Sequence, residues 1–264
     1  MVYSKIMGND SSDSDIVGKK VFFLYPTAVV QNRIIDELVQ QEYEIYIAKD
    51  KDTLRRVLRK YPDSIVFVDI NEKISEKEWE MWIKAVMEAP DTKGVSIGID
   101  TALDDELIKR KYLMTLKVKC GYTALKFDLE KAIKHILEVM HAVDAKGRRK
   151  FIRANTVNEP NATVNMPLNG MFVKGQILDI SVVGISCTLE GNPDIAKNSL
   201  FKDVQVKLHS NILKAEGIVF GSRMEDKDKI YVLLFTQRTD PEARTKIRKF
   251  IQQNLQSKMD NELK

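Results

Sequence analysis

The chain has 264 residues, of which 44% are hydrophobic and 30% charged, and its formal net charge at pH 7 is +4. A chain of this length is expected to form two domains, each with its own core, and the composition is that of a globular rather than a disordered protein. So small a positive surplus does not by itself indicate a nucleic-acid-binding protein, for which a concentrated basic face is typical.

Residues 1–18 lack the continuous apolar run of a secretory signal, and no stretch approaches the roughly 18 apolar residues of a membrane span. We therefore expect residues 1–18 to be disordered and the protein to be cytoplasmic, without insertion into a membrane. The two cysteines, Cys120 and Cys187, lie far apart in apolar segments without a CxxC motif. This pattern predicts reduced thiols in the core.

From residue 19 onward, apolar runs alternate with segments whose apolar residues recur at helical spacing. Such alternation is typical of βαβ crossovers and predicts a parallel sheet covered by helices on both faces. Residues 19–143 are therefore expected to form a doubly wound α/β domain. Its expected strands are 21–25, 43–48, 64–70, 94–99 and 117–127.

The boundary of this domain is predicted after its last helix, which begins at the N-cap Asp128 and ends near residue 143. Residues 144–155 follow, with a glycine and a dense group of basic side chains. We interpret this segment as a hinge between domains. Its positive residues are Lys146, Arg148, Arg149, Lys150 and Arg153.

After the hinge, the chain contains six short runs typical of strands, separated by turn-forming residues and without crossover helices. They predict a small six-stranded barrel. Asp240 and Pro241 then supply an N-cap and a first-turn proline, which open a final helix. We expect residues 156–257 to form the barrel and this helix, and residues 258–264 to form a frayed tail.

The sequence contains no GxSxG, P-loop, HExxH or GxGxxG motif. His135 and His141 are six residues apart, which places them on different faces of the predicted helix. We therefore expect a protein that is not an enzyme and has no catalytic residue, metal site or cofactor.

Two short polar motifs remain. Arg149 and Arg153 form an RxxxR pattern in the hinge, and Asp179, Ser181 and Gly184 form a DxSxxG pattern that is typical of a strand, a turn and a second strand. Aspartate, serine and glycine are also ordinary turn residues, with glycine often supplying a positive φ. The second motif alone is therefore weak evidence for a site.

The RxxxR spacing alone is weak as well. It recurs at residues 55–59 and 244–248, where predicted amphipathic helices give the two arginines a shared exposed face. The hinge copy differs in its position, directly before a barrel that carries the second motif.

Together the two motifs resemble the signature of the PilZ domain family, whose members are receptors for the bacterial second messenger cyclic di-GMP. The resemblance covers about residues 146–257 and implies a six-stranded barrel followed by a helix. It also implies a ligand site made of Arg149, Arg153, Asp179, Ser181 and Gly184.

The residue before RxxxR is Arg148. In the PilZ family an arginine at this position accompanies binding of two stacked, intercalated ligand molecules, so the resemblance implies a ligand dimer and adds Arg148 to the site.

The chemistry of these residues suits such a ligand. An arginine fork binds a phosphate or the O6/N7 edge of guanine with two hydrogen bonds, and its plane stacks on a base. The opposite edge of guanine donates hydrogen bonds, for which the Asp179 carboxylate is a suitable acceptor and the Ser181 hydroxyl a further partner.

Residues 19–143 look like a receiver domain of a response regulator in the order and length of their elements. Asp69 falls at the phosphoacceptor position, and Thr101 and Lys126 fall near the hydroxyl and lysine positions of a receiver. The acidic pair that would bind Mg²⁺ is missing, because residues 25–27 are Tyr-Pro-Thr. We expect this domain to have lost phosphorylation and to serve as a protein-interaction scaffold.

Trp79 and Trp82 lie three residues apart on one face of a predicted helix. Their spacing is compatible with packing in the core and with a partner surface, and the sequence leaves both interpretations open.

The favoured hypothesis is an adaptor that binds cyclic di-GMP across the hinge and the barrel turn, changes the arrangement of its domains and signals to a protein partner through the N-terminal domain. One alternative is a nucleic-acid-binding barrel, although the barrel region has few aromatic residues and mixed charges. The other is a phospho-regulated response regulator that uses Asp69.

Overall fold

The computed structural model of the chain describes residues 18–125 and 128–263. The predictions for residues 1–17 and for Lys126 lie outside these residues. The chain divides into two units, one comprising the described residues up to Lys150 together with those from Gln256 onward, and the other comprising Phe151–Leu255. The boundary at Lys150 falls within the predicted hinge.

The first unit contains the predicted parallel sheet, with its strands in the order β2-β1-β3-β4-β5. The fifth strand is shorter than expected, because Lys117 adopts a left-handed conformation (φ +57°) at the end of the preceding helix, so that strand pairing begins only later. The strands are β1 (Val21–Leu24), β2 (Ile45–Ala48), β3 (Ile65–Asp69), β4 (Ser96–Thr101) and β5 (Tyr122–Ala124).

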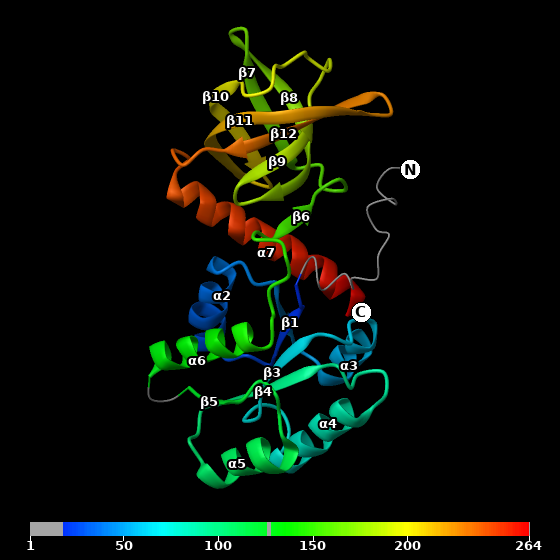
Figure 1. Ribbon diagram of the computed structural model, residues 1–264, viewed down its shortest axis with the longest axis vertical. Coiled ribbons are helices and arrows are strands. Elements are labelled where there is room, and N and C mark those ends of the chain that lie inside the picture. Colours follow the sequence, from blue (N-terminus) through cyan, green and yellow to red (C-terminus); the bar gives the residue numbers. More distant parts are fainter. Residues whose placement is uncertain (1–17, 126–127, 264) are drawn as a thin grey trace. The chain divides into compact units, whose positions relative to one another are not determined.

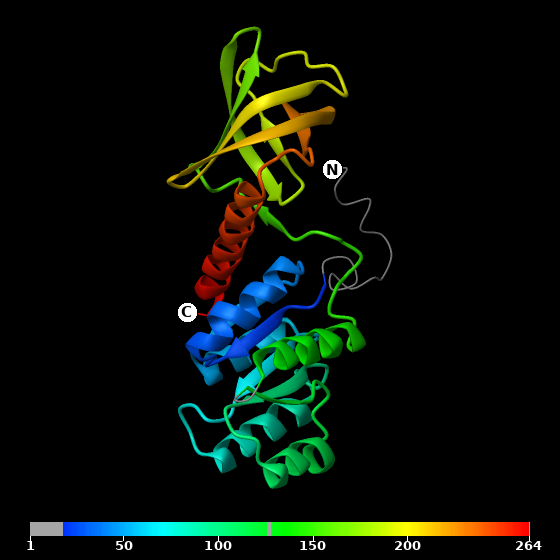
Figure 2. The ribbon, with the colours of Figure 1, turned by 90° about the vertical axis from the view of Figure 1, so that its left-hand side faces the viewer.

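Helices cover both faces of this sheet. Helices α2 and α6 lie on one face of the sheet, and α3 and α4 lie on the other (Figures 1 and 2). Apolar residues of η1, α2 and α6 form one buried cluster with residues of β1, β2 and β3. The doubly wound α/β fold is thus confirmed. The helical segments are η1 (Val30–Ile35), α2 (Asp36–Gln40), α3 (Lys51–Lys60), α4 (Glu76–Glu88), α5 (Glu106–Arg110), η2 (Lys111–Leu116) and α6 (Leu129–Ala142), and η1 and η2 are π-helical.

Local sequence explains where several of these helices begin. Asp128 caps α6 by accepting a hydrogen bond from the backbone N–H of Lys131 at 3.0 Å, as predicted. Ser75 and Glu78 form a reciprocal capping box at the start of α4. These side chains satisfy backbone donors that have no partner within the helix.

Trp79 and Trp82 both belong to the core of the first unit. Trp79 is completely buried and its indole N–H donates to the carbonyl of Glu72 at 3.0 Å, while Trp82 is 7% exposed. Their rings meet edge to face, with centroids 5.8 Å apart. The structure therefore decides between the two interpretations in favour of core packing.

The second unit is the predicted barrel. Six antiparallel strands follow one another in the order β8-β7-β10-β11-β12-β9, and pairing of β9 with β8 closes the ring. A seventh, short strand formed by the hinge, β6 (Arg153–Asn155), pairs with β8. The barrel strands are β7 (Ala162–Leu168), β8 (Met171–Ser181), β9 (Gly184–Thr188), β10 (Leu200–Leu208), β11 (Asn211–Glu225) and β12 (Asp228–Phe235).

The final helix, α7 (Pro241–Glu262), begins where predicted, with the Asp240 carboxylate accepting a hydrogen bond from the N–H of Glu242 at 2.8 Å. In Figure 1 its first turns lie at one end of the barrel, where apolar side chains of the helix join the barrel core. These side chains are Ala243, Ile247, Phe250 and Ile251.

Helix α7 continues beyond residue 257, where the sequence predicted a frayed tail. The residues from Gln256 onward belong to the first unit, and the Gln256 side-chain amide exchanges two hydrogen bonds with the backbone of Ile47, at 2.8 and 3.0 Å. Glu262 accepts a hydrogen bond from Lys60 at 2.6 Å. These long-range contacts hold the helical end in place.

Cys120 and Cys187 are buried free cysteines, which agrees with the prediction of core thiols. Burial raises the pKa of each thiol to about 12. None of the described helices is long and apolar enough to cross a membrane.

One glycine of the barrel provides a test of its packing. A Cβ atom on Gly175 of β8 would lie 1.9 Å from the carbonyl oxygen of Thr188. We expect Gly175→Ala to lower the free energy of unfolding by about 1–3 kcal/mol, because the backbone must shift to relieve this overlap. Urea denaturation followed by circular dichroism measures the change.

Gly221→Ala is the matched control, because a Cβ on Gly221 would meet nothing within 4 Å. Equal urea midpoints for the two variants would contradict the close approach of β8 to Thr188.

Candidate functional site

The hinge residues that enter the second unit alternate between the outside and the inside of the barrel. Arg153 and Asn155 are exposed, while Ala154 and Thr156 are buried. Thr156 fixes the end of the segment, since its N–H donates to Leu178 at 2.9 Å and its hydroxyl donates to Ile177 at 2.7 Å. This alternation directs Arg153 outward.

The pairing of β6 with β8 brings the two sequence motifs together. Arg153 lies opposite Ser181 in the register, and Asn155 lies opposite Asp179. The Arg153 guanidinium is 3.7 Å from the Asp179 carboxylate, and both side chains are partly exposed. A cation and an anion from motifs far apart in the sequence thus stand side by side at the barrel surface.

The remaining motif residues form the turn between β8 and β9. Ser181 pairs with Gly184, and the buried Ser181 hydroxyl donates to the carbonyl of Gly184 at 3.3 Å. The Ser181 hydroxyl therefore already has a partner within the turn.

Gly184 is required by packing. A Cβ atom at this position would lie 2.4 Å from the carbonyl oxygen of Leu233 on the neighbouring strand β12. Gly184 is not among the residues with a positive φ, so the possibility that it supplies one is wrong. The absence of a side chain at Gly184 thus allows the backbones of β9 and β12 to approach each other closely.

Arg148 and Arg149 are exposed and belong to the first unit, directly before its boundary. The structure therefore brings together Arg153, Asp179, Ser181 and Gly184 within the second unit, while Arg148 and Arg149 belong to the first.

Arg244 on α7 contacts the candidate site, which the sequence did not predict. Its four-residue spacing from Arg248 predicted an exposed face, which is wrong for Arg244. The residue is partly buried, and its guanidinium donates to the backbone carbonyl of Val182 in the β8–β9 turn at 3.0 Å. No local pattern signals this contact, because the two partners meet only in the folded barrel.

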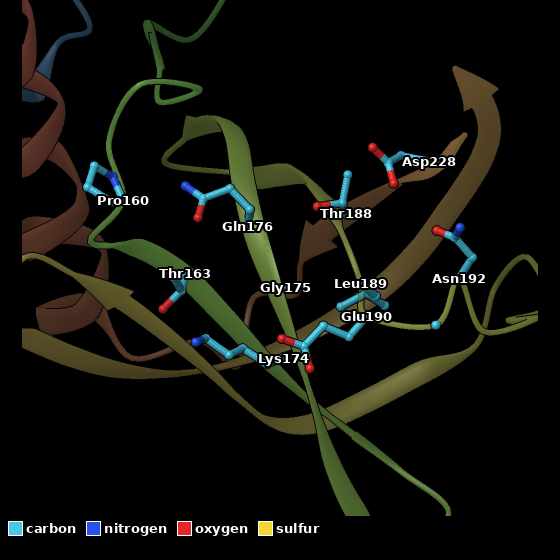
Figure 3. A pocket seen from close by; sticks show the side chains of 11 residues that line it. Pro160, Thr163, Lys174, Gly175, Gln176, Thr188, Leu189, Glu190, Asn192 and Asp228 are labelled. Atoms are coloured by element: carbon cyan, nitrogen blue, oxygen red, sulfur yellow. The ribbon is translucent and has the colours of Figure 1, made fainter. Parts of the chain in front are cut away.

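A separate hollow of about 380 Å³ lies on the barrel, around the middle of β8 (Figure 3). Gly175, the residue with no room for a Cβ, is among the residues lining it. Its lining is mixed polar and apolar and includes none of the predicted site residues. The residues labelled around it in Figure 3 are Pro160, Thr163, Lys174, Gly175, Gln176, Thr188, Leu189, Glu190, Asn192 and Asp228.

Asp69 and Thr101, two of the receiver-like positions, lie at the carboxyl edge of the parallel sheet. Asp69 ends β3 and pairs in register with Asp100 of β4, and both are buried. Thr101 donates its hydroxyl hydrogen to the side chain of Asn71 at 2.7 Å. Among the described residues, no group of three or more His, Cys, Asp or Glu side chains could hold a metal ion.

Burial raises the pKa of Asp69 to about 6, although an N–H···O bond from Asn71 opposes the shift. Burial and the neighbouring Asp69 together raise the pKa of Asp100 well above its usual range. Both carboxyl groups therefore bind protons more tightly in the folded unit than in the unfolded chain.

This proton affinity predicts a pH-dependent stability. Because the folded pKa of Asp69 is about 6 against a usual 3.8, its contribution favours folding below about pH 4 and is lost as the pH rises through 6. We expect Asp69→Asn to raise the free energy of unfolding at pH 7.5 by about 1–3 kcal/mol and to have little effect below pH 4.

Tryptophan fluorescence during thermal unfolding measures this effect on the first unit alone, since both tryptophans of the chain lie in α4. The exposed Asp104→Asn serves as the control. A stability difference that did not change with pH would contradict the raised pKa of Asp69.

No protein-family model matches the sequence, and no curated protein matches it. The chain is similar to the solved PilZ domain with cyclic di-GMP of YcgR from Escherichia coli, at 13% identity and a TM-score of 0.36, over 43% of this chain and 95% of that one. For the larger YcgR complex, the match spans about half of that chain, 51%.

Two further solved structures are similar to this chain at low identity. The MrkH–cyclic di-GMP complex from K. pneumonia matches at 17% identity and a TM-score of 0.39, over 44% of this chain and 57% of that one. The Mn(2+)-bound response regulator Rcp1 matches at 17% identity and a TM-score of 0.37, over 46% of this chain and 91% of that one.

Proposed function

We propose that the chain is a cytoplasmic, non-enzymatic adaptor that binds cyclic di-GMP at the hinge and the β8–β9 turn. The observation that carries this proposal is the juxtaposition of Arg153 and Asp179, whose charged groups are 3.7 Å apart on neighbouring strands. A guanine nucleotide with two phosphates needs both a bidentate cation and an anionic acceptor, and the two motifs supply them at one place.

Each side chain has a distinct role in the proposed complex. Arg153 binds a phosphate or the O6/N7 edge of guanine, and Asp179 accepts hydrogen bonds from the N1–H and N2–H₂ edge. The Arg153–Asp179 contact is partly solvated, so exchanging it for ligand contacts costs little. The turn carrying Ser181 and Gly184 supplies the surface against which the ligand rests.

Arg148 and Arg149 complete the site from the hinge. Each charge-assisted hydrogen bond contributes about 1.5–3 kcal/mol, while ordering the exposed hinge costs about 1–2 kcal/mol per immobilised residue. The expected balance is about −8 kcal/mol, which corresponds to micromolar dissociation. Such an affinity suits a reversible signal.

The position of the boundary between the units supports a response to the ligand. Arg148 and Arg149 belong to one unit and Arg153 and Asp179 to the other, with the boundary between Lys150 and Phe151. A ligand that contacts both groups restricts the hinge and so changes the distribution of domain arrangements. In the proposed function, the altered arrangement is recognised by a protein partner through the receiver-like unit.

The first test is calorimetric titration of the full chain with cyclic di-GMP. We expect binding by the wild type, and at least about tenfold weaker binding by Arg149→Ala and by Asp179→Ala, because each loses a charge-assisted contact. Arg56→Ala and Asp194→Ala are the matched controls. Both side chains are exposed, so these variants remove one positive and one negative charge, respectively, away from the candidate site. Absence of binding by the wild type, or equal affinity in all variants, would overturn the proposal.

The second test concerns the number of ligand molecules. We expect a ratio of two cyclic di-GMP molecules per chain for the wild type, and a ratio that falls towards one for Arg148→Leu, because the guanidinium that holds the second molecule is lost. Titration calorimetry measures the ratio, and Lys146→Leu in the same segment is the control. A ratio unchanged by Arg148→Leu would show that this arginine does not select a ligand dimer.

A further inference from the structure

The turn between β8 and β9 is built from residues that do not favour a tight turn. Two residues, Val182 and Val183, connect the paired Ser181 and Gly184. Hairpins with two-residue loops usually have a positive φ and residues such as Asn, Asp or Gly at these positions. Both residues are valine, and neither has a positive φ. The turn therefore depends on contacts from elsewhere in the barrel.

Two such contacts hold the carbonyl groups of the turn. The N–H of Phe235, at the end of β12, donates to the carbonyl of Val183 at 2.9 Å. The guanidinium of Arg244 donates through Nη1 to the carbonyl of Val182 at 3.0 Å and through Nη2 to the carbonyl of Thr236 at 2.6 Å. One side chain thus ties the turn to the segment that follows β12.

Helix α7 determines where this guanidinium lies. Asp240 caps the first turn of the helix, and its carbonyl accepts the N–H of Arg244 at 3.2 Å. Ala243 and Ile247, on the neighbouring face, are buried in the barrel core. Because the helix is anchored on both sides of Arg244, its side chain has a fixed point from which to bridge the two carbonyls.

We infer that Arg244 is a positioning residue for the ligand site. It holds the β8–β9 turn in the conformation that keeps Asp179 and Ser181 opposite β6, without itself contacting the ligand. The inference rests on the proposed function for its effect on binding. It links α7 to the ligand site, because the Arg244 side chain joins the first turn of the helix to the β8–β9 turn.

The first experiment needs no ligand. Amide hydrogen exchange of the full chain, followed by NMR, compares the wild type with Arg244→Met, which keeps a long apolar side chain but removes every donor. We expect exchange of the Phe235 N–H to be at least about tenfold faster in the variant, because its acceptor in the turn is no longer held. Shifts of the Val183 and Gly184 amide resonances are expected as well.

Lys246→Met is the matched control, because Lys246 is exposed on the same helix and forms an i,i+4 ion pair with Glu242 at 2.6 Å. It is expected to leave the exchange of Phe235 unchanged. Equal Phe235 exchange in the wild type and in Arg244→Met would overturn the positioning role.

The second experiment measures affinity for cyclic di-GMP by calorimetry. We expect about tenfold weaker binding by Arg244→Met and a similar loss by Arg244→Lys, because one ammonium group does not reproduce the planar fork that bridges two carbonyls. Wild-type affinity in Arg244→Lys would show that positive charge alone is responsible, and wild-type affinity in Arg244→Met would show a purely structural role. Either result would overturn the inference.

The two proposals fail in different ways. If the wild type does not bind cyclic di-GMP, the proposed function fails, while the exchange of Phe235 still tests whether Arg244 positions the turn. If Arg244→Met unfolds the barrel in circular dichroism, Arg244→Lys, which keeps the charge and most of the length, provides the comparison in both experiments.

Discussion

The short antiparallel pairing of β6 with the end of β8 is the interaction on which the candidate site depends. It involves three residue pairs and is anchored from inside by Ala154 and Thr156. Since side chains alternate along a strand, the same pairing directs Arg153 outward beside Asp179. A slip of one residue would turn Arg153 towards the core and separate the two motifs.

The turn beyond this pairing depends on the rest of the barrel. β6 and β9 both pair with the last residues of β8, so the motif segment is flanked by strands on both edges. Gly184 has no Cβ and so leaves room for the backbone of β12, and Arg244 links the turn to α7. The site is therefore a property of the closed barrel and its helix, although its sequence motifs span only a few residues.

The first unit carries two buried carboxyl groups at the carboxyl edge of its parallel sheet. Asp69 has a buried neighbour, Asp100, on the next parallel strand, and burial raises the pKa of both groups. Two buried carboxyl groups side by side favour their protonated forms. Burial removes the water that would stabilise each negative charge, and two neighbouring negative charges repel each other. The edge of the sheet is thus a source of pH-dependent stability for this unit.

The sequence by itself determined the two-part fold, the parallel and closed antiparallel sheets and the starts of α6 and α7, because periodicity and capping are local signals. It also singled out Arg153 and Asp179 as candidate site residues. Only the tertiary structure decided that these two meet, that the tryptophans are buried, that α7 extends to Glu262 and that Arg244 faces the β8–β9 turn. Each of these depends on contacts between residues far apart in the chain, which local patterns do not encode.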